Sequence, residues 1–179
     1  MKGGVIVSEL NSIVLFKEID RAISSFNVQE IHEECWNKEY ESINLSINKI
    51  SIKSRLAKKT PKKRGYFLAL WKKAQENINV PYQYEEFKDL LIVNILDEQY
   101  KGQFVFPKAV LAKHNVLCTN KAKGKMAFRV YPSWEENLNT SATKTQKWQS
   151  PYFIDLTHTI DKGKVNYLYF GSKESYAIL

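Results

Sequence analysis

Apolar residues near the start of the chain recur at the spacing of one helix face. Between residues 8 and 26 these positions are Leu10, Val14, Ile19 and Ile23. This pattern predicts an amphipathic helix, with Ser8 as its N-cap. The acid-rich residues 28–41 that follow predict a second helix or an irregular segment.

The pattern then changes from helical spacing to alternation. Apolar residues alternate at Ile43, Leu45 and Ile47 and again at Ile50 and Ile52. They predict a strand pair that turns near Asn48 and Lys49. LLIVNIL (90–96) is nearly continuous in apolar residues, as expected for a strand buried on both faces. A turn at 97–102 predicts an antiparallel partner, QFVFP (103–107).

The rest of the chain alternates between short apolar runs and polar stretches. It predicts a loop at 58–64, a strand at 65–73, a long loop at 74–88, a helix at 108–117, a strand at 125–132, a helix capped by Thr140 or Ser141, and an edge strand at 165–171. Helices interspersed with five or six strands predict one α+β domain over residues 1–179. Its central mixed sheet would be flanked by helices.

Charge is distributed very unevenly along this pattern. The chain has 27 Lys and Arg against 19 Asp and Glu, a net charge of +8. KSRLAKKTPKKRGYFLALWKK (53–73) holds nine of the cations and no acid, and the rest of the chain has 18 basic and 19 acidic residues. The whole positive excess therefore lies in one block, which predicts a local field that attracts polyanions.

Such a block has three possible interpretations. Lys and Arg held on a rigid sheet can follow a phosphate backbone, where each neutralised phosphate releases counterions. The same residues can instead dock an acidic protein partner. A lysine-rich loop can also be no more than a solvated surface.

Two further basic groups could extend the block. One is Lys121, Lys123, Lys125 and Arg129, and the other is Lys144 with Lys147. On the predicted helix Lys144, Lys147 and Trp148 share a face, and an exposed Trp there could stack on a base. Packing of Trp148 into the core is the alternative.

Familiar catalytic and metal-binding motifs are missing from the sequence. His32, His114 and His158 lie far apart, and no HExxH, GxGxxG, GxxxxGK[ST] or GxSxG occurs. Cys35 and Cys118 match no metal spacing, and no apolar stretch is long enough to span a membrane. We therefore expect no metal, no cofactor, and a cytoplasmic protein with reduced thiols.

One degenerate pattern points toward a nuclease. Asp89 opens the strand at 90–96, with Gln103 and Lys108 on the next strand and Glu39 or Glu41 before the first. Restriction-endonuclease-like enzymes hold Mg²⁺ with strand-end acids and use a nearby Lys. The spacing fits poorly, since Lys108 comes three positions late. We therefore expect no second carboxylate close to Asp89, with Lys108 pointing away from it, and favour binding without cleavage.

Several runs in the chain resemble the MepB family of small bacterial proteins, encoded in staphylococci beside a multidrug efflux pump. They are SRLAKKTPKKRGYFLALWKK, DLLIVNI, GQFVFPKAVL, GKMAFRVYPSW and KTQKWQSPYF, in that order. The resemblance implies a restriction-endonuclease-like core and binding to duplex DNA. It implies backbone contacts by Arg55, Lys58, Lys59, Lys62, Lys63 and Arg64, in a groove also lined by Arg129, Tyr131, Lys144, Lys147 and Trp148.

Overall fold

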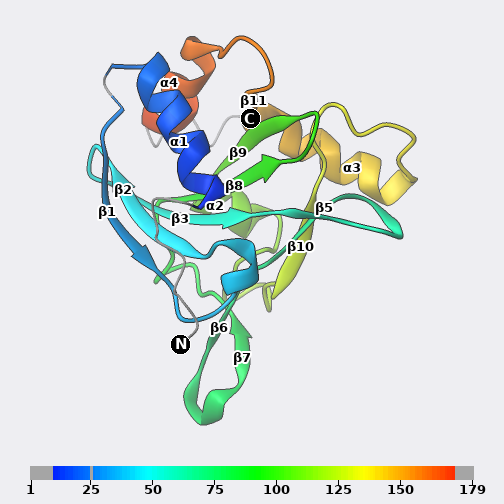
Figure 1. The fold of residues 1–179 in the computed structure, drawn as a ribbon. Coiled ribbons are helices and arrows are strands. Elements are labelled where there is room, and N and C mark those ends of the chain that lie inside the picture. Colours follow the sequence, from blue (N-terminus) through cyan, green and yellow to red (C-terminus); the bar gives the residue numbers. More distant parts are fainter. Residues whose placement is uncertain (1–9, 25, 172–179) are drawn as a thin grey trace, which may run out of the picture.

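A six-stranded sheet forms the centre of the molecule in the computed structural model, which describes residues 10–24 and 26–171. Its strands lie in the order β1 (Val28–Glu33), β2 (Ile43–Ile47), β3 (Ile50–Leu56), β8 (Leu90–Leu96), β9 (Lys101–Pro107) and β11 (Phe153–Asp155). Strands β3 and β8 are parallel and the other neighbours are antiparallel. The predicted α+β class with a mixed central sheet is therefore confirmed (Figure 1).

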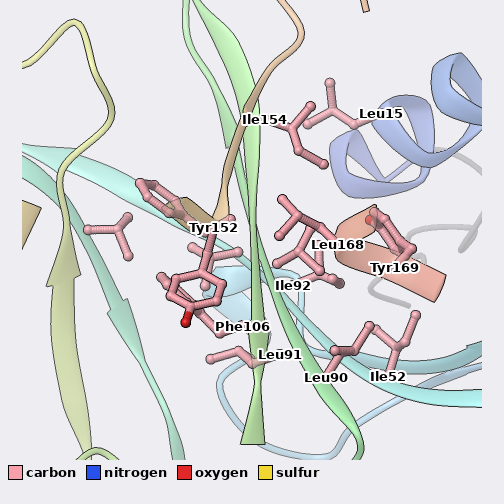
Figure 2. Close-up of a cluster of buried hydrophobic side chains, with 14 of the residues drawn as sticks. Leu15, Ile52, Leu90, Leu91, Ile92, Phe106, Tyr152, Ile154, Leu168 and Tyr169 are labelled. Atoms are coloured by element: carbon pink, nitrogen blue, oxygen red, sulfur yellow. The ribbon is translucent and has the colours of Figure 1, made fainter. Parts of the chain in front are cut away.

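Apolar side chains cover both faces of this sheet, because successive residues of a strand point to opposite sides. Leu90 and Ile92 of β8 face helices α1 (Asn11–Ala22) and α4 (Lys162–Phe170), whereas Leu91 lies with Phe106 and Tyr152 on the other side (Figure 2). All of β8 except its last residue is buried, as its continuous apolar sequence predicts.

A second sheet and a projecting hairpin complete the strands. The second sheet has the order β10 (Ala127–Val130), β5 (Lys63–Ala69) and β4 (Lys58–Thr60). Strands β6 (Trp71–Lys73) and β7 (Asn79–Pro81) form the hairpin, and α2 (Lys108–Lys113) and α3 (Thr140–Gln149) follow β9 and β10. Short 3-10 helices occupy Lys38–Tyr40, Gln75–Asn77 and Ser150–Tyr152.

The helix starts are capped by residues other than those predicted. Helix α1 begins at Asn11, and the remote carboxylate of Glu41 accepts hydrogen bonds from the backbone amides of Asn11 (3.0 Å) and Ser12 (2.7 Å). The predicted cap Ser8 lies outside the described residues. Asn139, rather than Thr140 or Ser141, caps α3. Both caps satisfy amide groups that a helix N-terminus leaves without partners.

Three predicted elements are wrong in type. The edge strand predicted at 165–171 is instead the last part of α4, which ends at Phe170. Asp161 caps this helix, and its buried positions Val165, Leu168 and Tyr169 lie on one helix face. Residues 28–41, predicted as a helix or an irregular segment, form β1, a short irregular stretch and a 3-10 turn. Most of the predicted loop at 58–64 is the β4–β5 hairpin, which turns at Pro61 and Lys62.

No helix within residues 10–24 and 26–171 has both the length and the apolar character needed to cross a membrane.

Candidate functional site

The basic block divides into a buried part and an exposed part. Lys53 and Arg55 alternate along β3 and point to the face that the second sheet covers. Their exposed fractions are 3% and 0%. Lys58, Lys59, Lys62, Lys63 and Arg64 are all exposed on the β4–β5 hairpin.

One carboxylate, Glu34, compensates the two buried cations. Its Oε2 lies 2.6 Å from Arg55 Nη2, and its Oε1 accepts a hydrogen bond from Lys53 Nζ. Tyr82 donates its hydroxyl to Oε1 at 3.1 Å, and Ser42 donates to Oε2 at 2.5 Å. The Lys53 ammonium also lies 4.5 Å from the centre of the Tyr82 ring. Every charge in this cluster is therefore paired within the protein.

Arg55 cannot reach a phosphate from this position, so its predicted role in backbone contact is wrong. Its Nε donates to the carbonyl of Ala69 at 3.3 Å and its Nη1 to the carbonyl of Ser54 at 2.9 Å. Its Nη2 contacts Glu34 as an ion pair without forming an aligned hydrogen bond to any described residue. Arg55 joins β3 to β5 and thereby positions the second sheet.

Burial and pairing shift the pKa values of this cluster. Burial would raise the pKa of Glu34, but the charges of Arg55 and Lys53 and hydrogen bonds from Lys53 and Ser42 lower it to about 2. Burial lowers the pKa of Lys53 to about 8, against the opposing influence of Glu34. Glu34 is thus ionised throughout the physiological range, as a structural counter-ion must be.

Arg129 holds the exposed hairpin in place. Its Nη2 donates to Thr60 Oγ1 at 2.6 Å, and its Nη1 lies 3.3 Å from the carbonyls of both Arg64 and Gly65. The guanidinium also lies 5.5 Å from the centre of the Phe67 ring. The structure therefore places Arg129 beside the predicted cations, but bonded to the hairpin backbone.

Gly65 brings Tyr131 against the same hairpin. Gly65 has φ +77°, a conformation that glycine adopts without strain. A Cβ atom at this position would lie 2.6 Å from the Tyr131 ring. Tyr131 is half-buried against the hairpin backbone. Its ring therefore packs on the hairpin, instead of lying open on the predicted basic surface.

Two of the five exposed cations are engaged within the fold. Lys59 pairs with Asp97 at 2.9 Å, and the Lys58 ammonium lies 5.6 Å from the centre of the Tyr40 ring. Burial would raise the pKa of Asp97, but hydrogen bonds, first from Tyr66 and then from Lys59, lower it to about 2. The ion pair of Lys59 therefore persists at neutral pH.

The other three cations, Lys62, Lys63 and Arg64, have side chains with no hydrogen bond or ion pair to any residue that the structure describes. They line a hollow of about 340 Å³ together with Lys59, Thr60, Pro61, Gly65 and Glu135. Glu135 accepts a hydrogen bond from the Gly65 amide at 3.1 Å. The hollow is thus strongly cationic, with one carboxylate at its edge. We call Lys62, Lys63 and Arg64 the tip cations.

Helix α3 lies next to this hollow. Gln146 donates to the carbonyls of Pro132 (2.9 Å) and Glu135 (3.0 Å), which fixes the helix beside Glu135. Lys144 and Lys147 are exposed on the same helix. That these two lysines join the tip cations in one surface stays a prediction.

Trp148 does not line this surface, and its predicted role in the groove is wrong. Its ring stacks on His114 with centroids 4.0 Å apart and lies 5.4 Å from Phe106 of β9. The apolar surface of β9 buries the indole because packing it there removes a large aromatic face from water.

The nuclease candidates fall into separate places. Asp89 accepts hydrogen bonds from the amide (3.0 Å) and hydroxyl (2.8 Å) of Ser51. Asp89 and Lys108 both line a cavity of about 420 Å³ at the start of β8, and the Lys108 ammonium lies 5.0 Å from the Tyr84 ring centre. The expectation that Lys108 turns away from Asp89 stays a prediction, since the two residues line one cavity while the Lys108 ammonium lies over the Tyr84 ring.

Gln103 and Glu39 do not join them. Gln103 is buried, pairs with Asn94 about 17 Å along β8 from Asp89, and bonds to Asn94 and Tyr169. Glu39 is exposed before β2, beyond the opposite end of the sheet from Asp89. Among the described residues no group of three or more His, Cys, Asp and Glu could hold a metal ion.

Together these features define a mixed α+β protein whose second sheet presents a cationic hairpin to solvent. The MepB-like family matches residues 34–155, and the chain belongs to that family. A solved structure described as "Crystal Structure of MepB" is 43% identical, with a TM-score of 0.74, over 84% of this chain and 99% of that one.

A second solved structure, a bacterial homing endonuclease, is 11% identical over 75% of this chain and 84% of that one. Its TM-score of 0.40 is too low to support a conclusion about fold or function. No curated protein matches the chain.

Proposed function

We propose that this protein binds duplex DNA through its phosphate backbone, with little dependence on sequence and without cleaving it. The observation that carries the proposal is the group of tip cations. They are unpaired among the described residues, and they project from a hairpin that Arg129 and Tyr131 hold rigid. A hairpin backbone that is held in place before binding need not be ordered when the cations on it meet a polyanion.

Neighbouring charges support the same ligand. Lys144 and Lys147 are exposed on α3, which Gln146 fixes beside Glu135, and in this proposal they extend the cationic surface beyond a single hollow. An extended row of exposed lysines suits a backbone of repeating phosphates better than a single small anion. Binding of DNA would place the protein in the cytoplasm, where bacterial DNA is found.

Cleavage is not part of the proposal, because the four nuclease candidates do not converge on one site. Asp89 and Lys108 share a cavity, whereas Gln103 is buried in a hydrogen-bonded network and Glu39 lies beyond the other end of the sheet. Mg²⁺-assisted hydrolysis needs carboxylates that converge on the ion.

Charge reversal at the tip tests the proposal. Lys62→Glu, Lys63→Glu and Arg64→Glu together should weaken binding to a random 20-base-pair duplex by at least about a hundredfold in a gel-shift titration. The matched control Lys17→Glu, Arg21→Glu and Lys162→Glu changes the net charge equally on α1 and α4, and should bind much like the parent.

A pull-down from nuclease-treated lysate distinguishes the alternative of an acidic protein partner. If the parent fails to bind duplex at low salt, yet captures one acidic protein that the tip variant loses, the DNA proposal is wrong. Equal binding by the tip variant and the parent would also contradict it.

A further inference from the structure

The β6–β7 hairpin stands apart from the body of the protein (Figure 1). Its strands pair at Lys73 and Asn79, and residues 74–78 connect them. Residues 74–79 are all exposed, including Ile78 at 56%. This end of the hairpin therefore contributes little to the core.

The connecting loop is nevertheless ordered by its own hydrogen bonds. Lys73 Nζ donates to the carbonyl of Asn77 at 2.8 Å, and the Ala74 amide donates to the carbonyl of Ile78 at 2.8 Å. Glu76 and Asn77 adopt positive φ, which lets the chain turn within this short loop. A loop ordered before binding loses little entropy when it meets a ligand.

The side chains at the hairpin end are of the types that recognise base edges. Amides such as Gln75, Asn77 and Asn79 can pair with adenine, and a carboxylate such as Glu76 can accept from cytosine. The major groove, about 12 Å wide, admits a two-stranded β-ribbon. An exposed apolar side chain such as Ile78 can contact a thymine methyl group there.

A basic loop flanks the base of the hairpin. Residues 118–126 are tied to it by the Leu70 amide, which donates to the Met126 carbonyl at 2.8 Å, and by the close approach of Gly124 to Pro81. This loop carries three exposed lysines, Lys121, Lys123 and Lys125. Cations beside a projecting ribbon can hold the phosphates that border a groove.

The same stretch of chain connects this hairpin to the tip cations. Strand β5 leads through Leu70 directly into β6, so at most about 35 Å of extended chain separates Lys63 from Lys73. One turn of duplex DNA measures about 34 Å. The two hairpin ends therefore lie within about one helical turn of duplex of each other.

We propose that the β6–β7 hairpin enters the major groove of a DNA duplex whose phosphates the tip cations bind. This inference rests on the proposed function and adds one contact to it. The β4–β5 hairpin holds the backbone and supplies most of the affinity, and the β6–β7 hairpin contacts base edges and adds a modest sequence preference.

Shortening the hairpin tests this inference. Replacing residues 74–78 with Asn-Gly keeps the pairing of Lys73 with Asn79 through a two-residue turn. It removes Glu76 and no cation, so electrostatics alone would strengthen binding. We expect about tenfold weaker binding to a 20-base-pair duplex, with an unchanged salt dependence. Because guanine N7 lies in the major groove, a ribbon seated there should shield it, so the parent should lower the total methylation of the duplex by dimethyl sulfate and the shortened variant should not.

Two further variants keep the result interpretable. Gln75→Ala with Asn77→Gly leaves the loop length and the positive φ unchanged, and should lose part of the affinity even if the shortened chain folds poorly. Glu76→Gln, which removes the charge alone, should bind at least as tightly as the parent.

The outcomes separate the inference from the proposed function. If the parent binds duplex DNA but leaves guanine N7 unprotected, or if the folded shortened variant binds as tightly as the parent, the groove contact is wrong and backbone binding stands. If the parent does not bind duplex DNA at all, both are wrong.

Discussion

Lys53 and Arg55 lie close in sequence to the tip cations, yet the two groups have opposite surroundings. Glu34, Tyr82 and the strands around them enclose the buried pair. The tip cations face solvent on a hairpin held by Arg129. A buried charge is costly unless it is paired, whereas an exposed charge costs the fold little. One basic block therefore contains structural cations and cations available to a ligand.

The largest expected effect comes from removing the counter-ion of the buried pair. Glu34→Gln leaves Lys53 and Arg55 together without a carboxylate, and should lower the free energy of unfolding by about 3–5 kcal/mol in urea titration. Glu86→Gln breaks the more exposed ion pair with Lys72 and should cost no more than about 1 kcal/mol. Equal losses in the two variants would show that the cluster at Glu34 does not differ from a surface pair.

The second largest effect should come from acid, which lowers the stability that the buried cluster contributes. Glu34 has a pKa of about 2 in the folded protein against an ordinary value of 4.5, so the unfolded chain takes up this proton first. The stability that Glu34 contributes is present above pH 4.5 and is lost as the pH falls toward 2, by about 2–3 kcal/mol. Unfolding free energies of the parent and Glu34→Gln should therefore converge between pH 4.5 and 2. A constant difference would contradict this.

A smaller effect should follow from removing the carboxylate at the hollow. Glu135→Gln keeps an oxygen that can accept from the Gly65 amide while removing the negative charge beside the tip cations. We expect duplex affinity to rise about twofold to fivefold at low salt, measured by fluorescence anisotropy. Asp20→Asn, an equal charge change on α1, should leave the affinity unchanged. Weaker binding by Glu135→Gln would mean that the hollow does not face phosphate.

Much of the fold could be predicted where one periodicity clearly dominates. Residues 90–96 are continuous in apolar residues and are followed by a turn, so β8 and its antiparallel partner β9 followed directly. The apolar pattern of residues 165–171 fits the repeat of a helix and that of a strand, because short runs of aromatic and branched residues are compatible with either. The cap at Asp161 is the signal that favours α4.

The candidate site could be predicted only in part. Counting charges finds the basic block but cannot separate Lys53 and Arg55 from the tip cations, because burial depends on tertiary packing. The available signal for burial was that Lys53 and Arg55 alternate along a strand that also carries apolar residues. Glu34 could not be chosen from the acids of residues 28–41, since its position depends on how β1 pairs with β2. The sequence left both exposure and core packing open for Trp148, because its partners His114 and Phe106 are remote in sequence.

The salt dependence of duplex affinity tests the central claim most directly. If the tip cations neutralise phosphates, Lys62→Ala, Lys63→Ala and Arg64→Ala together should reduce the slope of log K against log salt by about 3. The matched set Lys17→Ala, Arg21→Ala and Lys162→Ala should leave that slope as it is in the parent. An unchanged slope in the tip variant would contradict the account, because it would place the bound phosphates elsewhere.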